Sequence, residues 1–376
     1  MKFNTDNTLL AHAISNAATG ASAGEFSSLL IQAAEGFVRI CGTQGTILQV
    51  GVTIPADVEE AGSCALKFDD LMAIARVLPK GNRSVFTAAP TSRSALIVSG
   101  NAKFTLDTFD TTNIHVADIS EAEQHAETLP NGIWGKAIDA VISAVRIDAG
   151  NESLHGVHLL QEEHAIRVTG CDGFRVHCAW IPGHIPLPRR GDQYPQIIIQ
   201  AKTARESAKL IGKGEAAISG QSDWFYVASG DTYMRAAIID AQYPPIDGML
   251  TLPPDSITID RSSFAAMLTR VRAGMDRTNR SPTIVLHIHD NQITLRASGS
   301  QKAAEETMPA ATENYSLRVG INATYLQEAI SISKDALLRI SFHNESANQS
   351  VHFDSGSDAR DVHALIMPVR IPAEQE

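Results

Sequence analysis

The segment from position 155 to 178 contains side chains of the types most suited to catalysis or metal binding. They include His155, His158, Cys171, His177 and Cys178. Zinc sites use Cys and His at short spacings such as C-x-x-C, and the gap from Cys171 to Cys178 fits no such spacing. Strand alternation would also point residues 177 and 178 to opposite faces. A metal site is therefore not predicted here.

Nucleophilic catalysis has equally little support in the sequence. A Cys–His nucleophile needs an accompanying oxyanion-hole arrangement, and no signature of one lies near Cys171 or His177. Glu162, Glu163 and the aspartates are scattered and do not form a pair of catalytic carboxylates. An enzyme remains the rival interpretation from another class, and the sequence predicts no cofactor.

The length and composition of the chain predict a soluble protein with several domains. Its 376 residues are enough for two or three domains. No apolar run approaches the length of about 20 residues that a membrane helix needs, and residues 1–24 lack the apolar core of a secretory signal. Four cysteines suit a reducing compartment. We therefore expect a cytoplasmic protein without a membrane partner.

One unit is repeated three times along the chain. Three segments with the pattern strand, Gly-containing turn, strand and Pro end at Pro55, Pro182 and Pro309, which are 127 residues apart each time. Helical segments recur around them, at 8–18, 67–81, 132–145, 202–214, 263–275 and 322–335. The pattern predicts an α+β fold of three domains, 1–126, 127–253 and 254–376, each with two helices packed on antiparallel sheets. Residues 115–130 and 243–255 are the expected linkers.

Basic side chains gather on the predicted helices. Lys202, Arg205, Lys209 and Lys213 are spaced three or four residues apart, which places them on one helical stripe. Further candidates on other helices are Arg76, Lys80, Lys136, Arg146, Arg270 and Arg277. The net charge of the chain is −11, so these cationic faces imply one local basic surface on an acidic protein. Such a surface would bind duplex DNA through phosphates, without sequence preference.

With this repeat and these motifs, the sequence resembles the bacterial β sliding clamp family over nearly its whole length. The resemblance is carried by MKF at the start, SLLIQAAEGFVRICGT, VTGCDGFRV, Tyr243-Pro244 and IMPVR near the end. It implies the DNA clamp fold, in which two chains associate head to tail in a ring around duplex DNA and serve as a non-catalytic processivity factor of DNA polymerase. A separate clamp loader ATPase would open the ring, because this chain has no GxxxxGK[ST] phosphate loop.

The resemblance also implies a hydrophobic cleft that binds short peptides of the replicative polymerase, the loader and other partners. Carried over by position, its residues are Leu154, Cys171, Gly173, Phe174, Arg175, Val176, Pro244, Leu365, Met367, Pro368 and Arg370. The implied dimer contact brings Phe104 and Leu106 of one subunit to Met275 of the other.

The sequence departs from the family pattern around this cleft. Cys171 and Phe174 replace Thr and His of the family's turn, and Gly248 stands where an Arg is usual. Residues 372–376 extend past the usual end of the family. These changes leave two alternatives open: a specialised clamp paralogue of phage, plasmid or repair type, and a repeat scaffold that binds only proteins.

Overall fold

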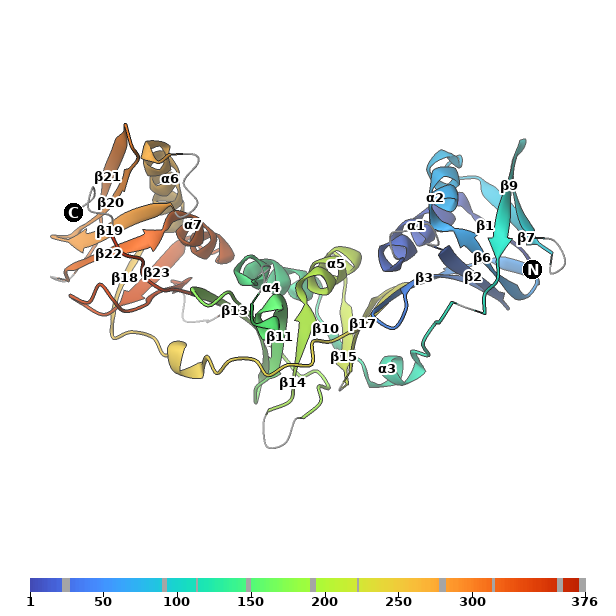
Figure 1. Cartoon of the computed structure of the whole chain (residues 1–376), viewed down its shortest axis with the longest axis horizontal. Helices are drawn as coiled ribbons and strands as arrows, with labels where there is room; N and C mark the ends of the chain where they lie inside the picture. Colours follow the sequence, from blue (N-terminus) through green and yellow to red (C-terminus); the bar gives the residue numbers. More distant parts are fainter. Residues whose placement is uncertain are drawn as a thin grey trace. The chain divides into compact units, whose positions relative to one another are not determined.

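The computed structural model describes residues 1–21, 28–89, 93–112, 114–146, 150–189, 194–221, 223–276, 282–312, 315–356 and 361–371. The chain forms two compact units (Figure 1), residues 1–135 with 184–239 and residues 136–183 with 240–376. Each unit joins one terminal third of the chain to part of the middle third. The division into three domains stays a prediction. Among the described residues, every helix is too short or too polar to cross a lipid bilayer.

The first unit is built on one long sheet. Its strands run in the order β10-β15-β16-β17-β4-β3-β2-β6-β9-β8-β7-β1-β5. The elements are β1 (Lys2–Asp6), α1 (Asn7–Ala17), η1 (Ala18–Gly20), β2 (Ser28–Ala34), β3 (Phe37–Gln44), β4 (Leu48–Pro55), β5 (Asp57–Glu60), β6 (Gly62–Lys67), α2 (Phe68–Val77), β7 (Arg83–Ala88), β8 (Ser94–Ser99), β9 (Ala102–Phe109), α3 (Ser120–His125), β10 (Glu127–Leu129), β14 (Gln196–Gln200), α5 (Ala201–Ile211), β15 (Ala216–Gly220), β16 (Trp224–Ser229) and β17 (Thr232–Ala237).

The second unit has two sheets, in the orders β11-β12-β13-β25-β24-β23-β18 and β21-β20-β19-β22. Helix α4 (Ile133–Val141) leads into it. Its other elements are η2 (Ile142–Ala144), η3 (Glu152–His155), β11 (Gly156–Gln161), β12 (Ala165–Cys171), β13 (Arg175–Pro182), η4 (Asp247–Met249), β18 (Asp255–Asp260), α6 (Arg261–Val271), η5 (Arg272–Gly274), β19 (Thr283–His289), β20 (Gln292–Ser298), β21 (Ala303–Pro309), β22 (Leu317–Asn322), α7 (Ala323–Ile332), β23 (Leu337–Phe342), β24 (Val351–Ser355) and β25 (Val362–Ile366).

The repeated strand–turn–strand pattern forms three antiparallel hairpins. They are β3–β4, β12–β13 and β20–β21. In each hairpin the closing proline faces the first residue of the opposite strand: Pro55 pairs with Phe37, Pro182 with Ala165 and Pro309 with Gln292. The repeat predicted from proline spacing is therefore confirmed at the level of these hairpins.

Several helices begin where a strand ends in a capping side chain. Asp6 caps α1, Asp260 caps α6 and Asn322 caps α7, and each side chain accepts hydrogen bonds from backbone N–H groups of the first turn. These N–H groups have no partner within a helix, so the caps fix the starting residue. Helix α6 buries Phe264, Met267, Leu268 and Val271, and Met275 after the helix is buried as well.

Two helices end before the last basic residue that was predicted to lie on them. Helix α5 stops at Ile211 because Gly212 adopts φ +58°, a conformation that ends helices. Lys213 thus lies in the following turn and off the predicted stripe. Helix α2 stops at Val77, and Pro79 follows. Lys80 is therefore also outside its helix, contrary to the prediction that it sits beside Arg76 on the same face.

The expected linker 115–130 contains secondary structure. Helix α3 and strand β10 both lie within it, and β10 pairs with β15. Ile119 and Ala122 pack with Trp224, Tyr226 and Tyr233 of the sheet. The predicted linker is therefore ordered by packing, because its few apolar residues have partners about a hundred residues away.

Glycine at position 170 lets a helix end approach strand β12 closely. A Cβ built on Gly170 would lie 2.2 Å from the carbonyl oxygen of Val141, at the end of α4. Gly42, in the corresponding strand β3, has the same relation to Ala17 at the end of α1, at 2.0 Å. Both neighbours are backbone atoms, so a side chain at either position requires the helix to move.

We therefore expect Gly170→Ala to lower the free energy of unfolding by about 1–3 kcal/mol, as overpacked positions do. Urea unfolding followed by circular dichroism measures the change. Gly248→Ala is the matched control, because nothing lies within 4 Å of its added Cβ; its effect should stay within about 0.5 kcal/mol. Equal unfolding midpoints for the two variants would contradict the close approach.

Candidate functional site

The turn between β12 and β13 is the centre of the predicted cleft. The Asp172 carboxylate oxygen Oδ1 accepts hydrogen bonds from the backbone N–H groups of Phe174 (2.9 Å) and Arg175 (3.0 Å). Gly173 adopts φ +91°, which a residue without a Cβ reaches at little cost. Its N–H donates to the Cys171 thiol sulfur at 3.4 Å. The side chain of Phe174 remains 61% exposed at the tip.

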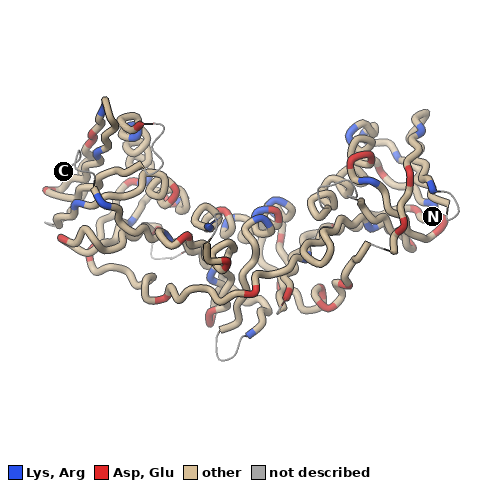
Figure 2. Tube along the Cα trace, in the orientation of Figure 1, with Lys and Arg blue, Asp and Glu red and all other residues tan. Residues whose placement is uncertain are grey.

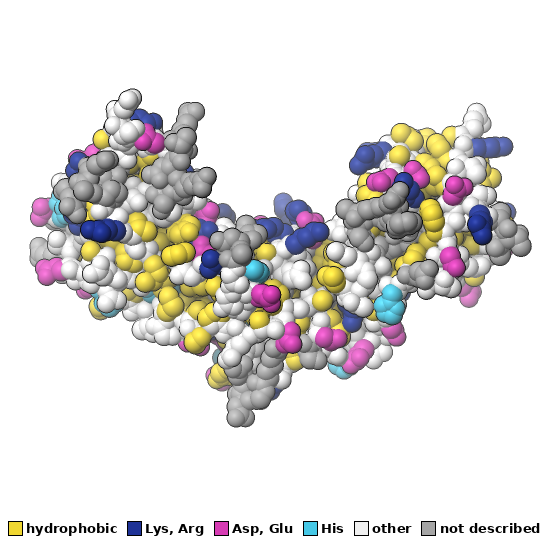
Figure 3. Space-filling model, in the orientation of Figure 1, with side chains coloured by type: hydrophobic (Ala, Val, Ile, Leu, Met, Phe, Trp, Pro, Cys, Tyr) yellow, Lys and Arg dark blue, Asp and Glu magenta, His cyan; other side chains and the backbone are white. Residues whose placement is uncertain are grey.

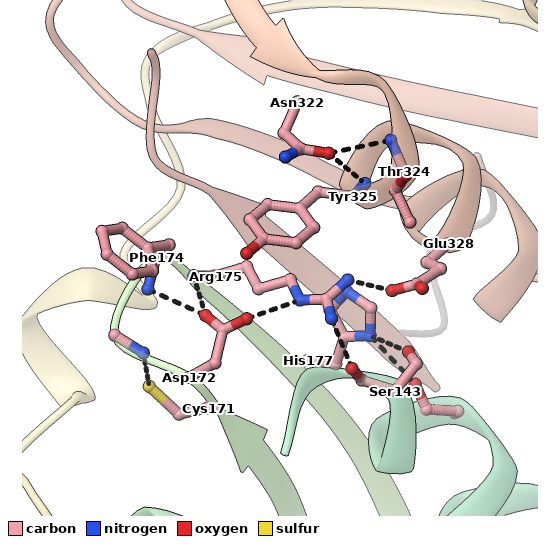
Figure 4. A network of polar contacts seen from close by, with 12 residues as sticks. Ser143, Cys171, Asp172, Phe174, Arg175, His177, Asn322, Thr324, Tyr325 and Glu328 are labelled. Atoms are coloured by element: carbon pink, nitrogen blue, oxygen red, sulfur yellow. Dashed lines mark hydrogen bonds and ion pairs between the residues drawn. The ribbon is translucent and has the colours of Figure 1, made fainter. Parts of the chain in front are cut away.

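Arg175 lies beneath this turn and is only 7% exposed. Its Nε donates to Asp172 Oδ2 at 3.0 Å. Its Nη1 donates to the carboxylate of Glu328 on α7, and its Nη2 donates to the carbonyl oxygen of Ser143 (Figure 4). The guanidinium also stacks over the Tyr325 ring, 4.0 Å from the centroid. Arg175 was predicted as part of the cleft wall, but its donors are engaged inside the protein.

The C-terminal segment contacts the same turn. Val176 pairs with Leu365 of β25, and the Met367 N–H donates to the carbonyl oxygen of Phe174 at 2.9 Å. Val176 and Leu365 are buried, whereas Met367 is half-buried. The structure therefore brings together the predicted residues Cys171, Gly173, Phe174, Arg175, Val176, Leu365 and Met367. Pro368 is half-buried and Arg370 is exposed; residues 372–376 lie outside the described part of the chain.

A third segment, 243–250, lies close to this hairpin. The Tyr243 ring stacks on His158 with centroids 4.2 Å apart, and Asp247 pairs with Arg167 at 2.6 Å. Burial, together with the nearby Cys171, raises the pKa of Tyr243 well above its usual value. Pro244 is half-buried and Met249 is exposed. Figure 3 shows hydrophobic side chains gathered over and beside β13.

Leu154 is the predicted cleft residue that the structure does not connect to this turn. It is buried in η3, and its carbonyl oxygen accepts from the backbone N–H of Arg146. Tyr325 and Glu328, which contact Arg175, were missed. Their three-residue spacing on α7 was a local signal that they share a face, but nothing in the sequence pointed that face at Arg175.

His177 and Cys178, two of the residues considered for catalysis or metal binding, are fully buried. Burial lowers the pKa of His177 to about 3, and its Nδ1 lies 3.2 Å from the carbonyl oxygen of Ala140. Burial raises the pKa of Cys178 to about 12, and its thiol contacts the Thr169 hydroxyl. The thiol is thus protonated near neutral pH and is a poor nucleophile. Within the described ranges, no three His, Cys, Asp or Glu side chains are arranged to bind one metal ion.

Helix α5 carries the clearest basic surface. Lys202 and Lys209 are exposed and Arg205 is half-buried, while Thr203, Ala204, Ser207 and Ile211 are buried on the opposite side. Figure 2 shows the Lys and Arg positions along this helix. Lys209 also pairs with Glu206 at 2.9 Å. Because exposed pairs of this kind are weak, Lys209 remains able to contact a phosphate.

The other basic candidates differ in availability. Arg76, Lys80, Lys136 and Lys213 are exposed, and Arg146 is half-buried beyond the end of α4. Arg270 is exposed but pairs with Glu306 of β21 through two nitrogens, Nε at 2.8 Å. This pairing offsets part of its positive charge. Arg277 lies outside the described residues.

Two of the predicted dimer residues, Phe104 and Leu106, lie on strand β9, and the third, Met275, follows η5. Residues 102–107 of β9 pair with β8 on one side, and β9 meets β6 only at 108–109. Phe104 and Leu106 on this strand are half-buried. Strand β21 is the terminal strand of its sheet. Met275 is buried inside its own unit, so its side chain packs in the interior and is not presented to solvent.

A cavity of about 350 Å³ lies in the first unit, and its lining includes none of the predicted cleft residues. It is bordered by α3, by residues 186–188 and by the β15–β16 connection, with Trp224 as its aromatic wall.

The sequence is similar to one family model and to several curated relatives. Residues 253–370 match the family model described as the C-terminal domain of the DNA polymerase III beta subunit. The beta sliding clamps of Salmonella typhimurium and Escherichia coli are 21% and 20% identical to this chain, and each alignment covers 92% of this chain and 92% of the relative.

Solved structures show the same fold. The DNA polymerase III subunit beta from Pseudomonas aeruginosa has a TM-score of 0.89 at 18% identity and covers 99% of this chain and 100% of its own. A sliding clamp from the same organism bound to griselimycin has a TM-score of 0.88, with the same identity and coverage. The predicted α+β clamp fold is thereby confirmed.

Proposed function

We propose that this chain is a β sliding clamp, which encircles duplex DNA as a ring and tethers a DNA polymerase there. The observation that carries the proposal is the clamp fold over 99% of the chain. The chain would act as a non-catalytic accessory subunit, as the family does. A closed ring stays on a duplex through topology, so each phosphate contact can be weak enough to permit sliding.

We propose three domains, 1–126, 127–253 and 254–376, in each of two head-to-tail copies. Support comes from the three equivalent hairpins and from the unpaired edges of β9 and β21. A head-to-tail interface that closes on itself gives a ring, whereas one that does not close gives a filament. Phe104 and Leu106 would meet the second copy near Met275.

The proposed DNA contacts come first from α5, with Lys202, Arg205 and Lys209 as its phosphate-binding side chains. Lys136 and Arg76 would add exposed charge from other helices. Since these groups read phosphates and not base edges, binding would be independent of sequence and would weaken as salt concentration rises. No base-reading element is needed for a clamp.

The proposed partner site is the exposed surface of Phe174, Met367 and Pro368, which would bind short segments with hydrophobic anchors from the replicative polymerase and the loader. Methionine suits such a surface because its flexible thioether repacks around different ligands. The relative from Pseudomonas aeruginosa binds griselimycin. We therefore take griselimycin as the first probe for this surface.

Encirclement predicts that retention depends on the topology of the DNA. The chain is loaded by its clamp loader and ATP onto a nicked circular plasmid, and the complex is isolated by gel filtration. Cutting the plasmid once should release most of the bound protein within minutes, because the ring slides off the new ends. An uncut sample and a sample with both ends blocked by bound protein are the controls.

The rival interpretation, a repeat scaffold that binds only proteins, predicts no retention on the circular plasmid. A protein that binds DNA only through surface charge would stay bound after linearisation and would leave equally from circles and linear DNA when salt is raised. Equal retention before and after cutting would thus contradict encirclement.

A further inference from the structure

Arg175 joins the 172–174 turn to helix α7 through a charged cluster. The guanidinium donates to Asp172 of the turn, to Glu328 of α7 and to the Ser143 carbonyl, while Tyr325 covers its face (Figure 4). Glu328 is 153 residues from Arg175 in sequence. The side chains of Asp172 and Glu328 are 13% and 29% exposed. Charge-assisted bonds between such poorly exposed groups are stronger and more directional than surface pairs.

The same cluster holds the backbone of Phe174 from both sides. Its N–H donates to Asp172 Oδ1, the carboxylate whose other oxygen receives Arg175 Nε. Its carbonyl oxygen accepts from the Met367 N–H. The backbone is therefore fixed while the aromatic ring is left 61% exposed. An exposed aromatic group on a fixed backbone is a pre-organised anchor, since little freedom remains to be lost when a ligand binds.

We propose that Glu328 is a positioning residue for ligand binding at the surface of Phe174 and Met367. It acts through Arg175, which it holds in the orientation that lets Asp172 fix the turn, and it does not touch the ligand. This inference rests on the proposed function of that surface. Without Glu328, Nη1 of Arg175 loses its acceptor, and the guanidinium keeps Asp172 and Ser143 as acceptors but has one constraint fewer on its orientation.

A direct role for Arg175 makes a different prediction. If Arg175 bound ligands itself, removing Glu328 would release the guanidinium toward the surface and strengthen ligand binding. Under the positioning role, removal of Glu328 weakens binding, because the Phe174 ring samples more orientations. The sign of the change separates the two roles.

The test is a double-mutant cycle on the full-length chain, with griselimycin affinity measured by isothermal titration calorimetry. Glu328→Ala should weaken binding about tenfold, a typical coupling between groups in one network. Glu328→Gln, which keeps an acceptor oxygen for Nη1, should lose less than about threefold. In a Phe174→Ala background, Glu328→Ala should cause no further loss. Glu163→Ala, at a side chain 87% exposed, is the matched control and should bind as wild type does.

The outcomes separate this inference from the function on which it rests. No griselimycin binding by the wild-type chain would reject the proposed partner surface itself. If the wild type binds, unchanged or tighter binding by Glu328→Ala would overturn the positioning role. A loss of equal size in the Phe174→Ala background would overturn it as well, since Glu328 would then act independently of the turn. Glu328→Gln decides the matter if circular dichroism shows Glu328→Ala to be unfolded.

Discussion

Reversing the charges of Lys202, Arg205 and Lys209 to Glu should remove most of the protein retained on circular DNA while leaving the dimer intact. Each lost phosphate contact makes the negative slope of log affinity against log salt concentration shallower by about 0.9. The slope of the triple variant should therefore be shallower than that of the wild type by about 2.7. Retention after gel filtration, repeated over a series of salt concentrations, measures both quantities. Sedimentation equilibrium measures the dimer.

The variant should remain folded because the altered side chains lie away from the buried face of α5. Thr203, Ala204, Ser207 and Ile211 keep their packing. A Glu near the start of the helix is favourable to the helix dipole and a Glu near its end is unfavourable, so the changes at 202 and 209 offset each other.

Glu206→Gln is the matched control on the same helix. It removes the acidic partner of Lys209 and should leave retention unchanged or raise it. Retention by the triple variant equal to that of the wild type would remove α5 from the proposed DNA surface.

The elements of the fold could be predicted because their signals are local. Each of the three hairpins was indicated by two short apolar strands around a glycine-containing turn, with one proline at the end of the second strand. In the structure the two strands of each hairpin pair as expected. Helix positions followed from apolar periodicity, and the structure shows in addition that caps such as Asp260 fix where the helices begin. The last residues of the helices did not follow from that periodicity: Gly212 and Pro79 were present in the sequence as end signals, yet the charge pattern was extended past them to Lys213 and Lys80.

Long-range pairing could not be predicted. Strand β17 joins β4, and β13 joins β25, so the sheets continue across the predicted domain boundaries. Such pairings depend on edges that become adjacent only in the folded chain. The partners of Arg175 follow the same rule: Asp172 was three residues away and visible, but Glu328 required knowledge of where α7 packs. Because Arg175 is buried, it stabilises the 172–174 turn from inside the protein and does not line the cleft.

Deleting residues 367–376 should abolish griselimycin binding, with a loss of at least about 100-fold, the scale seen when central anchors of an interface are removed. The deletion removes the Met367 thioether, Pro368 and Arg370. Strand β25 ends at Ile366, so its pairing with β13 and β24 is kept. The deletion also removes two backbone bonds, from Met367 N–H to Phe174 and from Val369 N–H to Gly320, each 2.9 Å long.

A shorter deletion separates the segment that contacts the turn from the residues after it. Removing only residues 372–376 keeps Met367 and the bond to Phe174, so binding should equal that of the wild type, or exceed it if the tail competes for the surface. Retention on circular DNA should be normal after removal of residues 372–376, whereas the longer deletion should also lose retention, because the loader binds the same surface when it loads the chain. Full affinity in the longer deletion would refute the assignment of the partner site to this segment, whereas lost affinity in both would assign binding to the last five residues.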